Sequence, residues 1–379
     1  MESRAPDRYS CAMRKTHTFA ALLGTAALAV VPASASATPY NWIKFNSKDH
    51  KPLVMAHQGG EDEFPSNTMF AFKSAAKAGV NSLELDIGVT KDGKIVVVHN
   101  TTFDSKSNAT GSVPVSQMTL AQVKALDAAY WFTTLPSSGG GHYDHDQATS
   151  HYTYRGVATG AKKAPSGYKA SDLKTPTLDE VLAAFPRTPI NIEIKGRTPT
   201  EASAEYLTNA TILANYLKNI HRTDLVVVSF NQNAVDLFST IAPAMPTAPA
   251  IAGDYAYLFS NFASRKMPSS QTVAFQVPNS FYVSSADLFA TGIANCSWIG
   301  RAHGDGYAWH QWFGSSYLTH PADTDGIGTG GNDGGWKYLL DRRVDGIMTA
   351  KPKALLAYMK TYKWTKATNV CKFVGGGGY

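Results

Sequence analysis

The chain has 379 residues, of which 44% are hydrophobic, and a formal net charge of +6 at pH 7. This length is sufficient for one large domain or two ordinary ones, and the composition excludes a largely disordered chain. The lysines and arginines are scattered rather than clustered, so the sequence predicts no nucleic-acid partner.

The first 37 residues have the pattern of a secretory signal peptide. Arg14 and Lys15 precede the apolar run FAALLGTAALAVV, and the small-residue stretch PASASATP follows it. This order is typical of an exported leader, with cleavage expected after Ala37. We therefore predict a signal peptide over 1–37 and a secreted protein over 38–379. No later stretch is long and apolar enough for a transmembrane helix, so we expect no stable membrane insertion, and a monomer.

Two cysteines, Cys296 and Cys371, remain once the leader is removed. In an oxidising compartment they could form one disulfide that ties down the C-terminal tail. Two buried thiols are the alternative, and the sequence leaves both open.

From residue 52 onward, apolar runs of strand length alternate with amphipathic stretches of helical period. The expected strands are 52–57, 82–89, 94–99, 189–195, 225–230 and 345–350. The expected helices are 68–79, 177–185, 201–220, 231–242, 336–344 and 352–362. Asn67 or Thr68 opens the first helix and Gly79 closes it.

This alternation predicts an α/β protein with a parallel sheet and helical crossovers. At this length, a single TIM-type (β/α)8 barrel is favoured. A doubly wound open sheet is second, because no glycine-rich dinucleotide fingerprint follows the first strand.

Two regions interrupt the alternation. Residues from about 100 to 175 are polar and glycine-rich, which predicts an inserted subdomain at one end of the barrel. Within it, HYDHD at 142–146 is either a second metal site or, as we favour, a solvated loop. Residues from about 295 to 335 are expected to be mostly loop. Their segment YAWHQWF at 307–313 is either a pocket wall or a barrel strand.

Acidic side chains share the polar faces of two predicted strands. In SLELDIGV, Glu84 and Asp86 alternate with apolar residues, and in PINIEIK the polar face carries Asn191, Glu193 and Lys195. Both faces of a barrel sheet are covered, so these polar faces are expected to point into the barrel mouth. Unpaired buried carboxylates are costly, and an all-oxygen set selects Ca²⁺ or Mg²⁺. A carboxylate–lysine network without metal is the alternative.

Two histidines end strands beside these acids. His57 ends the first strand, and His99 ends the strand that follows the turn KDGK. Both are expected at the same carboxyl-terminal rim as Glu84 and Asp86. Because histidine titrates near neutral pH, the two form a candidate pair of general acid and base.

Five short motifs succeed one another between residues 57 and 100. They are HQG at 57–59, PSNT at 65–68, ELD at 84–86, TKDG at 90–93 and HN at 99–100. Their order and spacing resemble the glycerophosphodiester phosphodiesterase family, which reads His-Arg-Gly, Pro-Glu-Asn-Thr, Glu-x-Asp, Thr-x-Asp-Gly and His-Asp. The later TPTLDEVLAAF, NIEIK, VVVSF and VDGIMTAKP also follow that family's order.

The resemblance implies a β/α barrel with a small subdomain inserted after the second histidine. It implies one divalent cation, Ca²⁺ or Mg²⁺, held by three acids: Glu84, Asp86 and Glu193. It gives His57 and His99 the acid and base roles, without saying which is which, and places Lys195 near the substrate phosphate. The implied substrate is a glycerophosphodiester, hydrolysed to an alcohol and sn-glycerol 3-phosphate.

Three positions depart from the family pattern. The arginine after the first histidine is Gln58 here, the glutamate of Pro-Glu-Asn-Thr is Ser66, and the aspartate after the second histidine is Asn100. Losing the arginine removes a bidentate phosphate contact. Either Arg197, Arg301 or another residue replaces it, or the headgroup is held differently.

The remaining expectations concern substrate and competing functions. Gln58 and Asn231, which match family positions at strand ends, are candidate substrate contacts. A lysophospholipase D or a headgroup-selective phosphodiesterase is a close alternative. A glycoside hydrolase using Glu84 and Glu193 belongs to another class, and a silent binding protein on the same fold to a third. The two rim histidines and Lys195 favour phosphodiester chemistry.

Overall fold

The computed structural model describes the residues 39–44, 51–135, 143–260, 269, 271–278, 281–283, 288–290, 294–313, 335–364 and 371. They belong to one compact unit, Ala37–Tyr379. The signal peptide predicted over 1–37 lies outside the described residues, as does the proposed cleavage site.

Parallel strands form the centre of the fold and follow the order β5-β4-β2-β1-β10-β9-β6. Their bounds are β1 Leu53–Ala56, β2 Ser82–Val89, β4 Ile190–Ile194, β5 Leu225–Ser229, β6 Ala274–Pro278, β9 Ala308–Trp312 and β10 Gly346–Thr349. Antiparallel to β2 runs the short β3, Ile95–Val97. Except for β3, every ladder in this sheet is parallel.

A single extended residue closes the sheet into a barrel. Thr247 bridges in parallel to Val227 of β5 on one side and to Thr272, just before β6, on the other. The amide of Val273 also donates to the carbonyl of Thr247 at 3.0 Å. The predicted TIM-type barrel is therefore confirmed, and the open sheet that was second is excluded.

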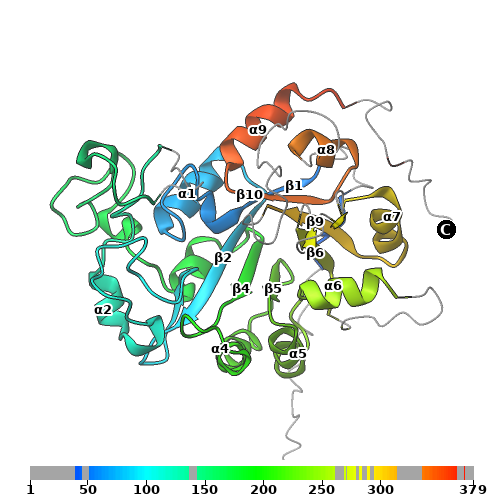
Figure 1. Cartoon of the computed structure of the whole chain (residues 1–379), viewed down its shortest axis with the longest axis horizontal. Helices are drawn as coiled ribbons and strands as arrows, with labels where there is room; N and C mark the ends of the chain where they lie inside the picture. Colours follow the sequence, from blue (N-terminus) through cyan, green and yellow to red (C-terminus); the bar gives the residue numbers. More distant parts are fainter. Residues whose placement is uncertain are drawn as a thin grey trace, which may run out of the picture. The chain divides into compact units, whose positions relative to one another are not determined.

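Helices surround the strands (Figure 1). Their bounds are α1 Met69–Ala78, α2 Leu120–Ala125, α3 Leu178–Ala184, α4 Ser203–Leu217, α5 Gln232–Ile241, α6 Ile251–Leu258, α7 Cys296–Gly304, α8 Trp336–Asp341 and α9 Pro352–Thr361. Of the two candidate caps for α1, Thr68 is the N-cap, since its side chain accepts from the Ala71 amide. Gly79 ends that helix with a φ of 97°, which glycine adopts without strain.

The prediction that residues from about 295 to 335 are mostly loop is wrong for the described residues of that region. Helix α7 begins at Cys296, and β9 is a barrel strand between β6 and β10. Strand β9 reads AWHQW and is almost wholly buried, so its two faces do not differ enough in polarity to give an alternating pattern. Helix α6, strand β6 and the hairpin β7–β8 (Phe281–Val283 and Leu288–Ala290) were also not predicted.

The two faces of β2 and β4 differ in chemistry, as predicted. Leu83, Leu85 and Ile87 join Ile190 and Ile192 in the core beneath the helices. The alternate residues point inward and are also buried. The barrel interior is therefore polar along these strands.

Residues 39–44 pack against the barrel interior. Trp42 is buried in one apolar cluster with Leu53, Val226, Ala274 and Ala308, which lie near the beginnings of their strands. This segment covers the amino end of the barrel and leaves the carboxyl end for a site.

In the described residues of the region predicted as an insertion, the helices are short and include α2 and three 3-10 turns. Three aromatic rings surround Arg155 in this region. Its guanidinium lies 3.9 to 4.4 Å from the ring centroids of Tyr130, Trp131 and Tyr152. His145, from the HYDHD segment, stacks on Trp131 at 3.9 Å. His142 lies outside the described residues.

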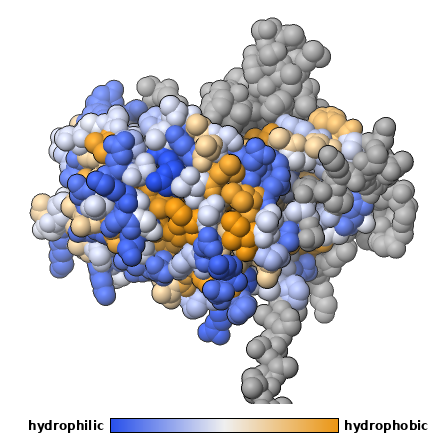
Figure 2. Space-filling view, turned by 90° about the horizontal axis from the view of Figure 1, so that it is seen from below, coloured by the Kyte–Doolittle hydropathy of each residue, from blue (hydrophilic) through white to orange (hydrophobic). Residues whose placement is uncertain are grey.

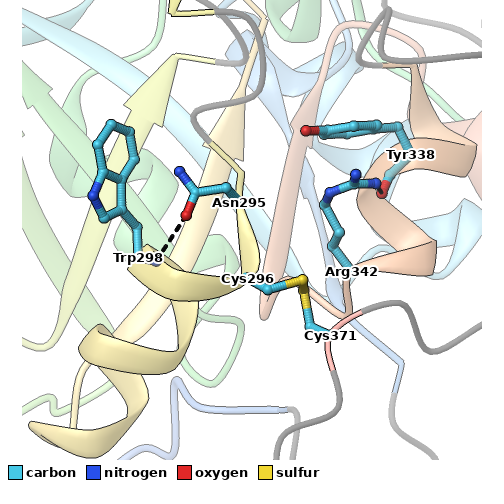
Figure 3. Close-up of a disulfide and its surroundings, with 6 residues drawn as sticks. All are labelled: Asn295, Cys296, Trp298, Tyr338, Arg342 and Cys371. Carbon is cyan, nitrogen blue, oxygen red and sulfur yellow. Dashed lines mark hydrogen bonds between the residues drawn. A yellow bond between two sulfur atoms is a disulfide. The ribbon is translucent and has the colours of Figure 1, made fainter. Parts of the chain in front are cut away.

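A disulfide joins Cys296 at the start of α7 to Cys371 (Figure 3). Asn295 caps the same helix, because its side chain accepts from the Trp298 amide. The question that the sequence left open is thus answered in favour of pairing.

Hydrophilic residues cover much of the face seen in Figure 2, with apolar residues gathered near its middle. Such mixtures are ordinary, since folded domains never bury all their apolar surface. Among the described helices, none has the length and apolar character needed to cross a bilayer.

Candidate active site

Three carboxylates meet inside the barrel because of the β2–β4 register. The parallel pairing sets Asp86 opposite Glu193, and Glu84 lies two residues earlier on the same face of β2. One carboxylate oxygen from each of the three residues lies within 4.8 Å of the others. Their exposed fractions are 1% for Glu84, 0% for Asp86 and 7% for Glu193.

Lys195 is the cation nearest this acidic group. Its Nζ lies 2.6 Å from Glu193 Oε1 and 3.2 Å from Asp86 Oδ1. Burial would lower the pKa of Lys195, but the charges of Glu193 and Asp86 raise it above its ordinary value. Lys195 is therefore positively charged at neutral pH.

The acids do not respond alike to their surroundings. Burial, reinforced by the charge of Asp86, raises the pKa of Glu84 to about 8, and burial also raises the pKa of Glu193. Asp86 differs, because burial, the largest single effect, is outweighed by the charges of Lys195, His99 and His57 together, and its pKa is lowered. Protein charge alone therefore does not stabilise three ionised carboxylates here.

His57 follows β1 directly and lies between two acids. Its Nδ1 donates to Glu61 Oε1 at 2.7 Å, and its Nε2 lies 3.9 Å from Glu84 Oε2. Burial lowers the pKa of His57, but the charges of Glu61 and Glu84 prevail and raise it to about 10. The Glu61 contact fixes the orientation of the ring.

His99 follows β3 and has the opposite electrostatic surroundings. Its Nδ1 lies 2.8 Å from Asn100 Oδ1. Burial, followed by the charge of Lys195, lowers the pKa of His99 to about 4. The two histidines thus carry different charges near neutral pH.

Asn67 orients one of the acids. Its Nδ2 donates to Asp86 Oδ2 at 2.9 Å, and its Oδ1 accepts from the Asp86 amide at 3.4 Å. The backbone of Asn67 has a φ of 55°, in the left-handed region that asparagine tolerates well. Asparagine is thus suited both to the left-handed backbone at this position and to the hydrogen bonds with Asp86.

A lysine from the predicted insertion reaches the residue that follows His57. Lys106 Nζ donates to Gln58 Oε1 at 3.0 Å and to Ser66 Oγ at 2.9 Å. The backbone amide of Gln58 donates to Glu84 Oε2 at 2.7 Å. Tyr143, also from the insertion, donates its hydroxyl to Ser66 Oγ at 3.1 Å. The departures at Gln58 and Ser66 therefore share one partner.

These groups line a cavity of about 800 Å³ at the carboxyl end of the barrel. Its polar side includes both histidines, Glu84, Glu193 and three lysines, Lys106, Lys195 and Lys351. Its apolar side includes Phe230, Trp312 and Phe313, of which the first two make an edge-to-face contact at 5.6 Å. Segment 307–313 is therefore both barrel strand and pocket wall.

The structure brings together most of the predicted site residues. His57, Gln58, Glu84, His99, Glu193 and Lys195 line the cavity, and Asp86 lies buried against Lys195. Asn231 is outside the lining. Its side chain caps α5 and donates to Ser203 Oγ at 3.0 Å. Its contact with substrate stays a prediction.

Neither arginine considered as a replacement at position 58 lines the cavity. Arg197 donates to Asn209 Oδ1, and Arg301 to the Leu258 carbonyl. The contacts of Glu61, Asn67 and Lys106 were not predicted. Glu61 had a sequence signal in lying four residues after His57, and Asn67 had one as the asparagine of PSNT.

The buried acids fit a hard divalent cation. Their ligand atoms are all oxygen, which is what Ca²⁺ and Mg²⁺ prefer. Asp86 Oδ1 and Glu193 Oε1 are buried and accept no well-aligned hydrogen bond in the described part of the chain. Three carboxylates against the charges of Lys195 and His57 still leave an excess of negative charge that a divalent ion would offset. Among the described residues, no other group of this kind is close enough to hold a metal.

A cavity of this composition at the carboxyl end of the strands defines a β/α-barrel hydrolase. The model of the Glycerophosphoryl diester phosphodiesterase family matches residues 57–354, and the chain belongs to that family. It is an enzyme of that class, a phosphoric diester hydrolase. The family resemblance is confirmed, and the glycoside hydrolase and the silent binding protein are not supported.

One curated relative matches most of the chain and another matches about a third of it. A glycerophosphodiester phosphodiesterase from Bacillus subtilis is 27% identical over 348 residues, covering 91% of this chain and 97% of that protein. A lysophospholipase D from Homo sapiens is 33% identical over 141 residues, covering 37% and 35%.

Solved structures share the fold. A glycerophosphoryl diester phosphodiesterase domain from Mycobacterium tuberculosis has a TM-score of 0.53 at 18% identity, covering 82% of this chain and all (100%) of that one. A phosphodiesterase from Oleispira antarctica, solved with the product sn-glycerol-3-phosphate, has a TM-score of 0.50 at 16% identity, covering 82% and 97%.

Proposed function

We propose that this protein is a secreted, divalent-cation-dependent phosphodiesterase that hydrolyses glycerophosphodiesters to an alcohol and sn-glycerol 3-phosphate. The observation that carries the proposal is the meeting of three acids and two histidines at one cavity. The named product of the Oleispira antarctica neighbour supports the second half of the reaction.

Glu84, Asp86 and Glu193 would hold the cation, either Ca²⁺ or Mg²⁺. When bound, the ion offsets negative charge that accumulates on the phosphate oxygens. Lys195, which is already paired with two of the acids, adds a positive charge on the same side of the cavity.

The histidines would move the protons. One takes a proton from the attacking water as its oxygen bonds to phosphorus. The other donates a proton to the alcohol oxygen as its bond to phosphorus breaks. Glu61 would keep the ring of His57 aimed into the cavity through the hydrogen bond at Nδ1.

The apolar wall supports a second candidate substrate. Phe230, Trp312 and Phe313 could accept a single acyl chain, which would make the enzyme a lysophospholipase D. The matching segment of the human lysophospholipase D is consistent with this variant.

Turnover of glycerophosphocholine and of a lysophosphatidylcholine by the purified full-length protein, with and without EDTA, tests the activity. We expect glycerol phosphate from the first substrate, loss of turnover on chelation, and recovery on adding Ca²⁺ or Mg²⁺. His57→Ala and His99→Ala should each reduce kcat by about 10²–10⁴-fold. His221→Ala, an exposed histidine, is the matched control. Turnover that survives EDTA and either substitution contradicts the proposal.

Secretion rests on the leader pattern, and the Cys296–Cys371 disulfide is consistent with an oxidising compartment. In an exporting host, the culture medium should contain a protein whose first residue is Thr38. Retention of an unprocessed chain inside the cells would contradict this part of the proposal.

A further inference from the structure

Two departures from the family motif meet at one ammonium group. Gln58 stands where the family has arginine, and Ser66 where it has glutamate. Lys106 Nζ donates to the side chains of both, at 3.0 Å and 2.9 Å. Two charged residues of the motif are thus absent at the same place where this chain brings in a lysine from its insertion.

The hydrogen-bond acceptors of Lys106 are neutral, and its ion pair with Glu61 is long. Both bonded oxygens, on Gln58 and Ser66, are neutral. Glu61 Oε2 lies 3.9 Å from Nζ, which is an ion-pair distance but is beyond hydrogen-bond distance. An ammonium has three N–H donors, and these two contacts use two of them.

The position of Lys106 is suited to an anionic ligand. The side chain is 26% exposed and lines the cavity, so its third donor can reach a bound molecule. The Tyr143 ring lies 4.8 Å from Nζ and supports the ammonium from one side.

Other lysines of the cavity are bound differently. Lys195 is in ion pairs with Asp86 and Glu193, and Lys351 lies 3.5 Å from a carboxylate oxygen of Asp62. Lys106, by contrast, donates its hydrogen bonds to the neutral oxygens of Gln58 and Ser66.

We propose that Lys106 binds a non-bridging phosphate oxygen of the substrate and of the product, in place of the arginine that Gln58 replaces. Gln58 and Ser66 hold the ammonium in position. The inference rests on the proposed function for the identity of the substrate. Because lysine is a point charge rather than a planar fork, it recognises the phosphate without fixing its rotation.

Phosphate affinity separates this role from a merely structural one. In the purified full-length protein, Lys106→Ala should raise both the KM for glycerophosphocholine and the dissociation constant for inorganic phosphate by about 10–100-fold. Lys106→Gln keeps hydrogen-bonding capacity without the charge and should show a similar loss if the alanine variant does not fold. Lys124→Ala is the matched control, a lysine of the same region that pairs with Glu180.

A compensating change makes the test reciprocal. Gln58→Arg in the Lys106→Ala background should recover at least tenfold of the lost phosphate affinity. The reason is that the guanidinium at position 58 restores the positive charge that the lysine supplied. Gln58→Arg alone should give no gain, because two cations would then compete for one place.

Calorimetry with inorganic phosphate does not depend on turnover. If glycerophosphocholine is not hydrolysed but phosphate binding falls in Lys106→Ala, the substrate assignment fails and the role of Lys106 stands. If turnover is as expected but the folded Lys106 variants bind phosphate like the unaltered protein, the inference about Lys106 is wrong. It is equally wrong if phosphate does not bind at all, or if Lys106→Ala only lowers the melting temperature.

Discussion

Asn67 illustrates how much of the site depends on single residues that are not themselves reactive. It contacts Asp86 through both its side-chain amide and its side-chain carbonyl, at 2.9 Å and 3.4 Å. Its left-handed backbone brings the side chain under β2. A residue with a β-branched or longer apolar side chain would lose the contact and strain the turn.

We expect Asn67→Ala to weaken the affinity for Ca²⁺ or Mg²⁺ by about 10–100-fold, because second-sphere contacts set the orientation of a metal ligand. Titration of activity against free cation measures this, and kcat at saturating cation should change less than the affinity. Asn215→Ala, an exposed asparagine on α4, should leave the titration unchanged. An unaltered cation dependence in Asn67→Ala would show that Asp86 is held without it.

At the scale of elements, the alternation of polar and apolar residues along β2 and β4 was the most predictable feature. Alternation alone indicated that Glu84, Asp86 and Glu193 would share the interior, and the register places them together. Lys106 and Tyr143 could not be predicted, because their contacts depend on how the non-periodic insertion lies against the barrel. Thr247 closes the sheet through isolated bridges, and one extended residue has no strand pattern to detect.

Helix α7 is tied to distant chain by the Cys296–Cys371 disulfide, which spans 75 residues (Figure 3). Cross-linking restricts the unfolded chain, so Cys371→Ser should lower the free energy of unfolding by about 2–4 kcal/mol. Denaturant unfolding measures this loss. The double variant Cys296→Ser/Cys371→Ser should behave like the single one, and reduction of the unaltered protein should reproduce it. Equal stability with and without reductant would contradict the prediction.

Considered as a whole, the domain has its candidate active site at the carboxyl end of the barrel, and a covering segment at the amino end. Residues 39–44 cover the amino end, where Trp42 packs beside His310 with ring centroids 5.9 Å apart. His310 is 1% exposed and occupies the interior of β9. Gly346 on the neighbouring strand leaves room for it, since a Cβ there would lie 2.7 Å from the His310 ring. The barrel interior therefore contains a titratable group on β9, His310, in addition to the acids on β2 and β4.

This histidine should make the stability of the whole domain sensitive to acid. Burial lowers the pKa of His310 to about 4, against the opposing charge of Asp345 and with a smaller contribution from Lys44. Its folded pKa lies below the ordinary value of 6.5, so the unfolded chain binds the proton first as pH falls. Stability from this group is therefore intact above pH 6.5 and is lost between about pH 6.5 and 4, by up to about 3 kcal/mol.

Urea unfolding across this pH range should show a shallower loss for His310→Gln than for the unaltered protein. The exposed His221→Gln should keep the original slope, and equal slopes in His310→Gln and the unaltered protein would mean that folding does not shift the pKa of His310.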